Sequence, residues 1–226
     1  MLRENRSPEI PSAGNNPGTP VISFLSEADA GPVTQLYADI FLADEPTSVR
    51  IAPDPARLLP LAHWYVGLLA RRGFSFVARA PHTGEPVGFL FSFDITDDFC
   101  EDPMRYAAYL DNFREAIAMI DELEERFLDR RSIPPGAVLH ALQGGVSRDY
   151  RRCGLLKAMM ERLVTRARER GYRQIVAECT NPASHKALLA SGFCQAGFLA
   201  YDTFQINGAP CFAGLSGGLS LMVLDL

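Results

Sequence analysis

The chain has 226 residues, a formal net charge of −5, and 47% hydrophobic residues. This length suits one large domain or two small ones, and no apolar run reaches the ~20 residues of a membrane-spanning helix. The acidic balance disfavours nucleic-acid binding, which favours a basic face. Five cysteines without Cys-x-x-Cys spacing disfavour a disulfide framework or a zinc site. Because a signal-peptide core is also missing, we expect reduced thiols, a cytoplasmic location and no metal.

The first half of the chain is predicted to alternate between strands and helices. Residues 1–20, rich in Pro, Gly, Asn and Ser, are expected to form a flexible arm. The first helix should end near Pro46, because the residue before a proline is pushed out of the helical region. Gly73 should close the second helix. The predicted elements are a strand over 21–25, helices over 32–44 and 58–72, and strands over 74–80 and 87–95 joined by a hairpin turn at 82–85.

Residues 97–131 differ in character from the segments around them. Apolar residues recur there at helical spacing, and an acidic run over 121–125 crosses the pattern. We interpret the segment as one long helix or two shorter ones, with the acidic residues forming a solvated face rather than a site. Pro134-Pro135-Gly136 should end it.

The second half is predicted to continue the alternation. Gly144 and Gly145 near a strand end indicate a bulge or the close approach of a ligand to the backbone. Asn181 is a predicted helix cap, with Pro182 at the first helical position. The whole order predicts a single α/β domain over 21–226. The elements are strands over 137–146, 174–179, 198–206 and 219–224, and helices over 154–170 and 181–191.

The turn between Val146 and Ala158 joins a predicted strand to a predicted helix. A helix start carries unpaired N–H groups and a partial positive charge, which suits a phosphate. Gly154 would let the backbone approach closely, and Arg151, Arg152 and Lys157 would add cationic donors. An isolated Arg-x-x-Gly is usually a surface turn, but the glycine pair before it and the Asn-led helix after it favour a phosphate-binding turn.

Two motifs resemble the GNAT superfamily of acyl-CoA N-acyltransferases. Residues 151–156 resemble the pyrophosphate loop (Arg/Gln)-x-x-Gly-x-(Gly/Ala), although Leu156 stands at the last position. Residues 181–188 with Gly192-Phe193 resemble the helix along the coenzyme arm, although Leu188 stands where a general-acid Tyr is common. The segment 40–46, Ile-Phe-Leu-Ala-Asp-Glu-Pro, is similar to the Phe-x-x-x-Glu-Pro segment of insect-type arylalkylamine N-acetyltransferases.

The resemblance implies a mixed, mostly antiparallel central sheet flanked by helices, with an extra helical insertion at about 97–131 between the third and fourth strands. It implies acetyl-CoA as co-substrate and transfer of its acetyl group to a primary amine of a small molecule by direct attack. The implied coenzyme-binding residues are Gly145, Val146, Arg151, Arg152, Cys153, Gly154, Leu155, Leu156, Lys157, Asn181, Ser184 and Lys186.

Three side chains compete for the role of general base, because an amine of pKa near ~10 is almost wholly protonated at neutral pH. Glu45 holds the Glu-Pro position of the resemblance; otherwise it is a solvated acid at a helix end. His140 titrates in the right range and shares a face with Leu142 and Val146 if no bulge intervenes. Glu178, just before Cys179, is the third candidate.

Other functions and assemblies stay open at this point. The chain could acetylate a protein lysine or N-terminus, or bind acyl-CoA without catalysis, an alternative that Leu156 and Leu188 support. A homodimer is also compatible with the sequence. A nucleotide-binding domain is disfavoured, since neither Gly-x-x-x-x-Gly-Lys-(Ser/Thr) nor Gly-x-Gly-x-x-Gly occurs.

Overall fold

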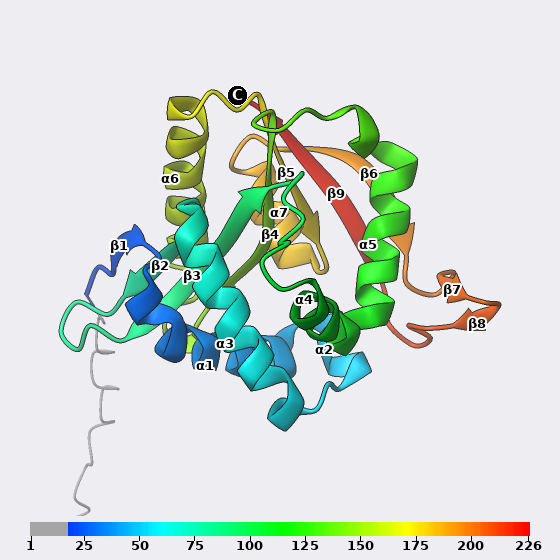
Figure 1. Ribbon diagram of the computed structural model, residues 1–226, viewed down its shortest axis with the longest axis horizontal. Helices are drawn as coiled ribbons and strands as arrows, with labels where there is room; N and C mark the ends of the chain where they lie inside the picture. Colours follow the sequence, from blue (N-terminus) through cyan, green and yellow to red (C-terminus); the bar gives the residue numbers. More distant parts are fainter. Residues whose placement is uncertain (1–17) are drawn as a thin grey trace, which may run out of the picture.

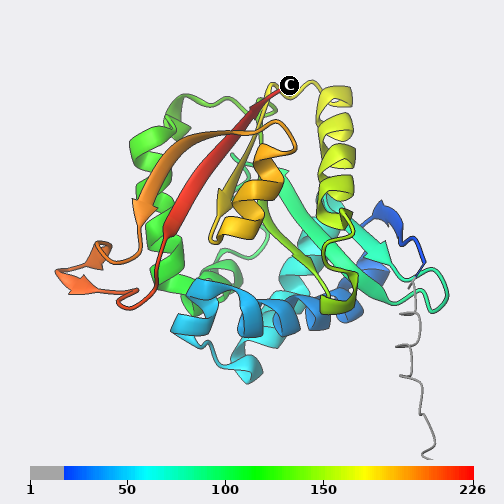
Figure 2. The same cartoon turned by 180° about the vertical axis from the view of Figure 1, so that it is seen from behind.

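A computed structural model describes residues 18–226, so most of the predicted arm at 1–20 lies outside the described residues. Its centre is a seven-stranded sheet in the order β1-β2-β3-β4-β5-β9-β6 (Figures 1 and 2). Neighbouring strands run antiparallel except β4 and β5, which are parallel. The prediction of a mixed, mostly antiparallel sheet flanked by helices is confirmed. None of the helices within residues 18–226 is long and apolar enough to span a bilayer.

The elements follow the predicted order closely. The strands of the main sheet are β1 Val21–Phe24, β2 Phe76–Arg79, β3 Pro86–Asp94, β4 Val138–Val146, β5 Gln174–Cys179, β6 Cys194–Ala200 and β9 Gly218–Asp225. The helices are α1 Ala30–Asp44, α2 Pro46–Ile51, α3 Pro55–Arg72, α4 Pro103–Leu110, α5 Arg114–Phe127, α6 Leu155–Glu169 and α7 Pro182–Leu189. A small hairpin, β7 Gln205–Ile206 with β8 Ala209–Pro210, projects beyond the main sheet (Figure 1).

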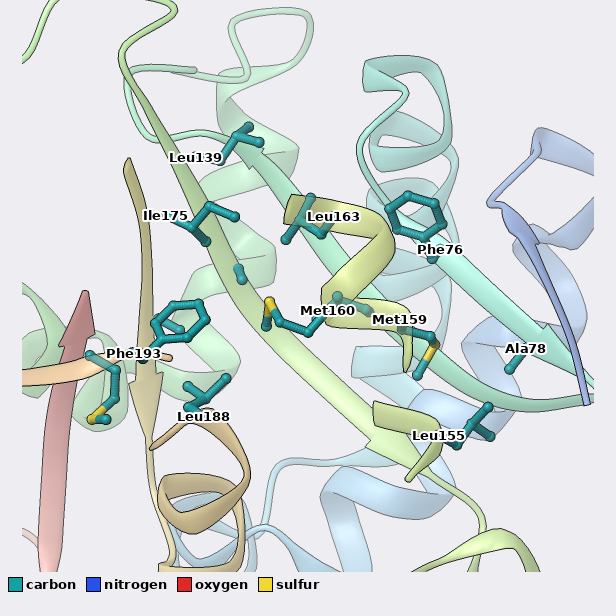
Figure 3. Packing of buried hydrophobic residues seen from close by; sticks show 14 of the residues in the cluster. Phe76, Ala78, Leu139, Leu155, Met159, Met160, Leu163, Ile175, Leu188 and Phe193 are labelled. Atoms are coloured by element: carbon teal, nitrogen blue, oxygen red, sulfur yellow. The ribbon is translucent and has the colours of Figure 1, made fainter. Parts of the chain in front are cut away.

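Alternating side chains give the sheet two apolar faces. Helix α6 packs on one face, where Leu163 lies near Leu139 and Ile175, and Met159 lies toward Leu155 and Ala78 (Figure 3). The opposite face carries the three phenylalanines of β3, which the strand pattern predicts to lie together, under α1 and α3. Further along that face, α5 packs over β6 and β9 through Met119. The sheet is therefore covered on both sides, and the site must lie at a sheet edge or an opening.

The sheet opens between β4 and β5. These strands are in register only from Val138 to His140, opposite residues 174–176, and both continue beyond that point without pairing. We call this opening the fork. Because parallel strands that separate leave backbone donors and acceptors unpaired, a ligand can bind there by its own hydrogen bonds.

A bulge lies close to the fork. On β3 the partners step from Phe91 to Ser92, while on β4 they step from Gln143 to Ala141, so Leu142 is the extra residue. The predicted bulge is thus present, displaced by two residues from the glycine pair. It inverts the face predicted for His140, which now shares a face with Gln143 instead of with Val146.

Three other predictions are wrong. The loop after Pro46 contains the short helix α2, and the strand predicted at 198–206 begins at Cys194 and ends at Ala200. Two helices, α4 and α5, occupy the segment predicted as one or two, but its acidic run is not wholly solvated. The Glu124 side chain is only 2% exposed, because this turn of α5 faces the sheet.

Gly145 supplies a stability test. A Cβ at this position would lie 2.8 Å from the Phe89 ring and 3.1 Å from Ile40 Cδ1. We expect Gly145→Ala to lower the free energy of unfolding by about 1–3 kcal/mol through overpacking, measured by urea denaturation. Gly31→Ala is the matched control: Gly31 lies in α1, and a Cβ added there would meet no atom within 4 Å, so the change should be neutral or stabilising. Equal behaviour of the two variants would contradict the packing argument.

Candidate active site

A cavity of about 640 Å³ occupies the fork. Its floor is the end of β4 and of β5, from Ala141 to Val146 and from Ala177 to Cys179. The starts of α6 and α7 line one side, and α1, α2, α4 and α5 contribute the other. We call these the donor side and the acceptor side. The arrangement places two different chemical environments on either side of one opening in the sheet.

The donor side is built on the start of α6. Gly154 precedes this helix with φ 75°, and Arg152 also has a positive φ of 62°. A residue other than glycine is rarely found in this region, so the loop is held in an unusual conformation. The curl leaves the first amides of α6 at the cavity, where a helix start favours an anion. The predicted turn is therefore a curled loop before a helix start that borders the cavity, and phosphate binding there stays a prediction.

Most of the predicted coenzyme-binding residues line the cavity. Cys153 and Lys186 do not. Those that do are Gly145, Val146, Arg151, Arg152, Gly154, Leu155, Leu156, Lys157, Asn181 and Ser184.

Arg151, which is predicted to bind the coenzyme, makes hydrogen bonds within the protein. Its guanidinium donates to the Val146 carbonyl at 3.0 Å and to Asp44 at 2.5 Å, while Arg148 donates to the same carboxylate at 2.8 Å. These hydrogen bonds, that of Arg148 first, hold the pKa of the Asp44 carboxyl below its usual value. Arg151 thus fastens the loop to the end of α1. Arg152 is exposed and makes no ion pair with any residue in 18–226.

Leu156 both lines the cavity and packs into the α6 face of the core. A Cβ on Gly144 would lie 2.9 Å from its Cδ1 atom, so the side chain lies against β4. The glycine at 144 makes room for the leucine. Packing toward β4 reduces the crowding of the loop that a larger residue at this motif position would cause.

The end of β4 offers backbone donors to the opening. Ser147 N donates to Val87 O at 2.9 Å, and hydrogen-bonded pairs alternate along an antiparallel ladder. The amides of Gly144 and Val146 therefore point away from β3, toward the fork. Gly145 and Val146 are both among the predicted coenzyme-binding residues. The Val146 amide points toward the fork, whereas the Gly145 amide points to β3.

Asn181 and Ser184 organise the start of α7. The Asn181 side chain accepts hydrogen bonds from Ala183 N and Ser184 N, both at 3.0 Å, which confirms the predicted cap with Pro182 next to it. The Ser184 hydroxyl donates back to the Asn181 carbonyl at 2.9 Å. Both side chains thus shape the cavity wall through their own local hydrogen bonds.

Glu45 is the carboxylate of the acceptor side. It caps α2, with Oε1 accepting from Thr47 N at 3.1 Å and Oε2 accepting from Ser48 N at 2.6 Å and from the Thr47 hydroxyl at 2.7 Å. The residue is partly exposed and lines the cavity. Burial, with the Glu45 charge nearby, raises the pKa of Tyr201, whose hydroxyl donates to Thr180 O. The other acceptor-side residues are mostly apolar, among them Phe41, Tyr109, Phe113, Ile117 and Ile120.

The two other predicted bases form a buried cluster instead. His140 Nε2 and Glu178 Oε2 lie 2.6 Å apart, and Glu124 Oε1 lies 3.9 Å from the same nitrogen. Arg130 donates to the far oxygen of Glu124 at 2.6 Å. We call these four residues the fork cluster. His140 does not line the cavity, and the Glu178 side chain is 2% exposed, although that residue does line it.

Burial and neighbouring charges together shift the pKa values of His140 and Glu124. Burial by itself would lower the pKa of His140, but the charge and hydrogen bond of Glu178, with the charge of Glu124 behind them, raise it above its usual value. Burial raises the pKa of Glu124, and the positive charges of His140 and Arg130 offset part of that effect. One carboxylate oxygen of each glutamate and one ring nitrogen of His140, atoms of the kinds that bind metal ions, lie within 4.8 Å of one another. With Arg130 already on Glu124, one proton on His140 suffices to balance the charges.

Sequence reasoning did not identify Glu124 as a polar partner of the site. Its position in an acidic run of a helix is typical of a solvated face. The only signal in the sequence is that Leu123 and Glu124 fall on the same side of α5 as Met119 and Ile120 at helical spacing.

Solved structures with the same fold include several acyltransferases. Arylalkylamine N-acetyltransferase 2 from Aedes aegypti has 17% identity and a TM-score of 0.71, over 93% of this chain and 99% of that one. Drosophila melanogaster polyamine N-acetyltransferase has 17% identity and a TM-score of 0.66, over 92% and 100%. The C-terminal condensation domain of Ebony, in complex with beta-alanyl-dopamine, has 14% identity and a TM-score of 0.69, over 92% and 99%. At these identities the likeness shows the fold.

The sequence itself gives the family. No curated protein matches the chain, but the family model described as acetyltransferase (GNAT) family matches residues 34–193. This range runs from α1, through β4 and the loop before α6, to the end of α7. It therefore includes both sides of the cavity, and the chain belongs to the acetyltransferase (GNAT) family, whose members are acyltransferase enzymes.

Proposed function

We infer that the protein is an N-acetyltransferase that transfers the acetyl group of acetyl-CoA to a primary amine of a small molecule. The observation that carries this proposal is the position of Glu45: a partly exposed carboxylate on the acceptor side of the fork, facing a donor side made of helix-start amides. Family membership supports the donor, and the acceptor side supports the amine.

The donor side has the groups that a pyrophosphate requires. The first amides of α6 carry the partial positive charge of the helix start, and Arg152 and Lys157 lie beside them at the cavity. The amides of Gly144 and Val146 face the fork, where they can donate to a thioester oxygen as negative charge develops on it. The backbone therefore supplies the oxyanion stabilisation, and the loop supplies the anchoring.

The acceptor side supports an amine carried on an apolar arm. Asp44 is neutralised by Arg148 and Arg151, and the Glu178 side chain is held by His140. Glu45 is therefore the one acceptor-side carboxylate within residues 18–226 that is not in an ion pair. One available negative charge among aromatic and aliphatic side chains suits an arylalkyl or alkyl monoamine better than a polyamine, which carries further cations to be balanced.

Glu45 is the proposed general base. At neutral pH only about one amine in a thousand is uncharged when its pKa is ~10, so the nitrogen must lose a proton before it can attack. Glu45, acting through a water molecule, takes the first of the two protons that the ammonium group loses, which frees the nitrogen lone pair to attack the thioester carbon. The second proton leaves the nitrogen as the nitrogen–carbon bond forms and the carbon–sulfur bond breaks, and it passes to solvent or to the departing thiolate. The thiol leaving group has a pKa near ~8.5 and departs as a thiolate without a strong acid, so leucine at 188 is compatible with turnover.

The direct test has two parts. Calorimetry should show acetyl-CoA binding to the protein alone, and coenzyme A release should then follow with arylalkylamines and alkylamines more readily than with polyamines or agmatine. A peptide with a lysine and a free N-terminus tests the protein-acetylation alternative. Release should be measured by chromatography, because Cys100, Cys153 and Cys194 are exposed and react with thiol dyes. Absence of acetyl-CoA binding, or release only with the peptide, would contradict the proposal.

A further inference from the structure

The fork cluster lies where the pairing between β4 and β5 ends. His140 is the last residue of β4 in register with β5, and Glu178 follows two residues after its partner Val176. Glu124 reaches the pair from α5, a helix that does not belong to the sheet. Three elements are therefore joined by charged side chains at the point where the cavity begins.

The same helix forms part of the acceptor side. Ala116, Ile117, Met119 and Ile120 of α5 line the cavity, and Glu124 lies one turn beyond Ile120. Apolar contacts through Met119 and Leu123 also hold α5 to the sheet, so the ionic contact adds to a packed interface. The ionic contact and the acceptor wall therefore lie about one helical turn apart on the same helix.

The cluster is balanced only when His140 carries a proton. Glu124 and Glu178 contribute two negative charges, and Arg130 and protonated His140 contribute two positive ones. Loss of the proton leaves a net negative charge among side chains that are 2% and 5% exposed. One oxygen of each glutamate is already buried without a hydrogen-bond partner. Buried carboxylates without a balancing charge repel each other and are poorly solvated, so the contact between α5 and the fork weakens.

We propose that Glu124 and protonated His140 act as positioning residues that hold α5, and with it the acceptor wall, against the fork. The groups facing His140 are Glu178 of β5, Glu124 of α5, Arg130 after α5 and the Phe93 ring of β3. Because the pKa of His140 is raised, the contact is complete below ~6.5, the usual histidine value, and is lost as the pH rises through the raised value. The proposal rests on the proposed function only for its kinetic consequence.

The first measurement is independent of activity. The chain has four histidines, so histidine-selective NMR should show four imidazoles, and the signal missing from His140→Asn would assign His140. Glu124→Gln removes a negative charge and should lower the pKa of His140, whereas Arg130→Gln removes a positive charge and should raise it. Glu122 is a partly exposed carboxylate on the same helix that pairs with Arg126, and Glu122→Gln is the matched control, which should leave the pKa of His140 unchanged. General damage to the fold would not give opposite signs.

The second measurement follows α5 itself. Hydrogen-exchange protection factors of the α5 amides should fall as the pH passes the His140 pKa, and the pH of that fall should move down in Glu124→Gln and up in Arg130→Gln. In turnover, Glu124→Gln should raise the KM for the amine about 3- to 10-fold relative to Glu122→Gln, with kcat nearly unchanged. Because both variants are measured at the same pH, the protonated fraction of the amine is the same and does not affect the ratio of their KM values.

The outcomes separate the two proposals. Opposite pKa shifts with matching changes in α5 protection support the positioning role, even in a protein without turnover, which would overturn only the proposed function. Shifts of the same sign, or α5 protection that ignores the state of His140, would overturn the positioning role. If Glu124→Gln does not fold, Arg130→Gln still tests the sign of the change in the His140 pKa, because the Arg130 side chain is 45% exposed and its replacement should leave the fold intact.

Discussion

Glu45→Gln is expected to lower kcat/KM for the amine about 10²- to 10⁴-fold while acetyl-CoA binding stays unchanged. The magnitude is that of a lost general base. The substitution keeps the shape of the side chain. With its amide oxygen at the Oε2 position it can still accept from Ser48 N and from the Thr47 hydroxyl, so only the 3.1 Å bond from Thr47 N is lost. The helix cap is therefore largely retained, and the measured loss reports the missing basic group. Steady-state kinetics with calorimetry of acetyl-CoA binding measure both quantities.

A matched control exists on the next helix. Asp54 caps α3 by accepting from Ala56 N at 3.0 Å, and it does not line the cavity. Asp54→Asn makes the same exchange of carboxylate for amide at a helix cap and should keep nearly full activity. If Glu45→Gln is as active as Asp54→Asn, the base is not Glu45. A much larger loss in Glu178→Gln, or in His140→Asn through kcat rather than KM, would then move the base to the fork cluster.

The sequence predicts the sheet and most helices because their signals are local. Phenylalanines at alternate positions mark β3. Gly73 marks the end of α3, and Asn181 marks the start of α7. Helix α2 was missed because six residues are too short for a periodic pattern, and its cap is a glutamate, which is not among the preferred capping residues. The sequence Glu45-Pro46, with proline at the first helical position, was the one local sign of this helix.

The donor side was easier to predict than the acceptor side for the same reason. A strand, a glycine turn and a helix start are contiguous in the chain, so the loop at 151–156 can be read in order. The partner of Arg151, however, is Asp44, more than a hundred residues away, and no local pattern indicates that pair. The same limit applies to Glu124, whose burial depends on how α5 meets the fork, and to His140, whose face depends on the one-residue bulge at Leu142.

The ion pair of Arg151 decides which cations remain for the coenzyme. Arg151 donates to Asp44 and to Val146 O, so it is already engaged in fixing the loop. Arg152 makes no ion pair within residues 18–226, and Lys157 makes an exposed contact with Glu161 at 3.3 Å, which is weak and easily exchanged. We therefore expect Arg152 and Lys157, rather than Arg151, to contribute most of the direct charge at the phosphates.

Replacing both residues in Arg152→Ala/Lys157→Ala should raise the Kd for acetyl-CoA roughly 100-fold. A hydrogen bond to a charged group contributes ~1.5–3 kcal/mol, and two exposed ones near the lower end give this factor. Calorimetry at two salt concentrations checks it, since the wild-type protein should lose affinity with salt more steeply than the variant. Arg168→Ala/Arg170→Ala removes the same charge from the far end of α6, outside the cavity, and should bind normally. Equal weakening in both double variants would mean that net charge, rather than the loop, attracts the coenzyme.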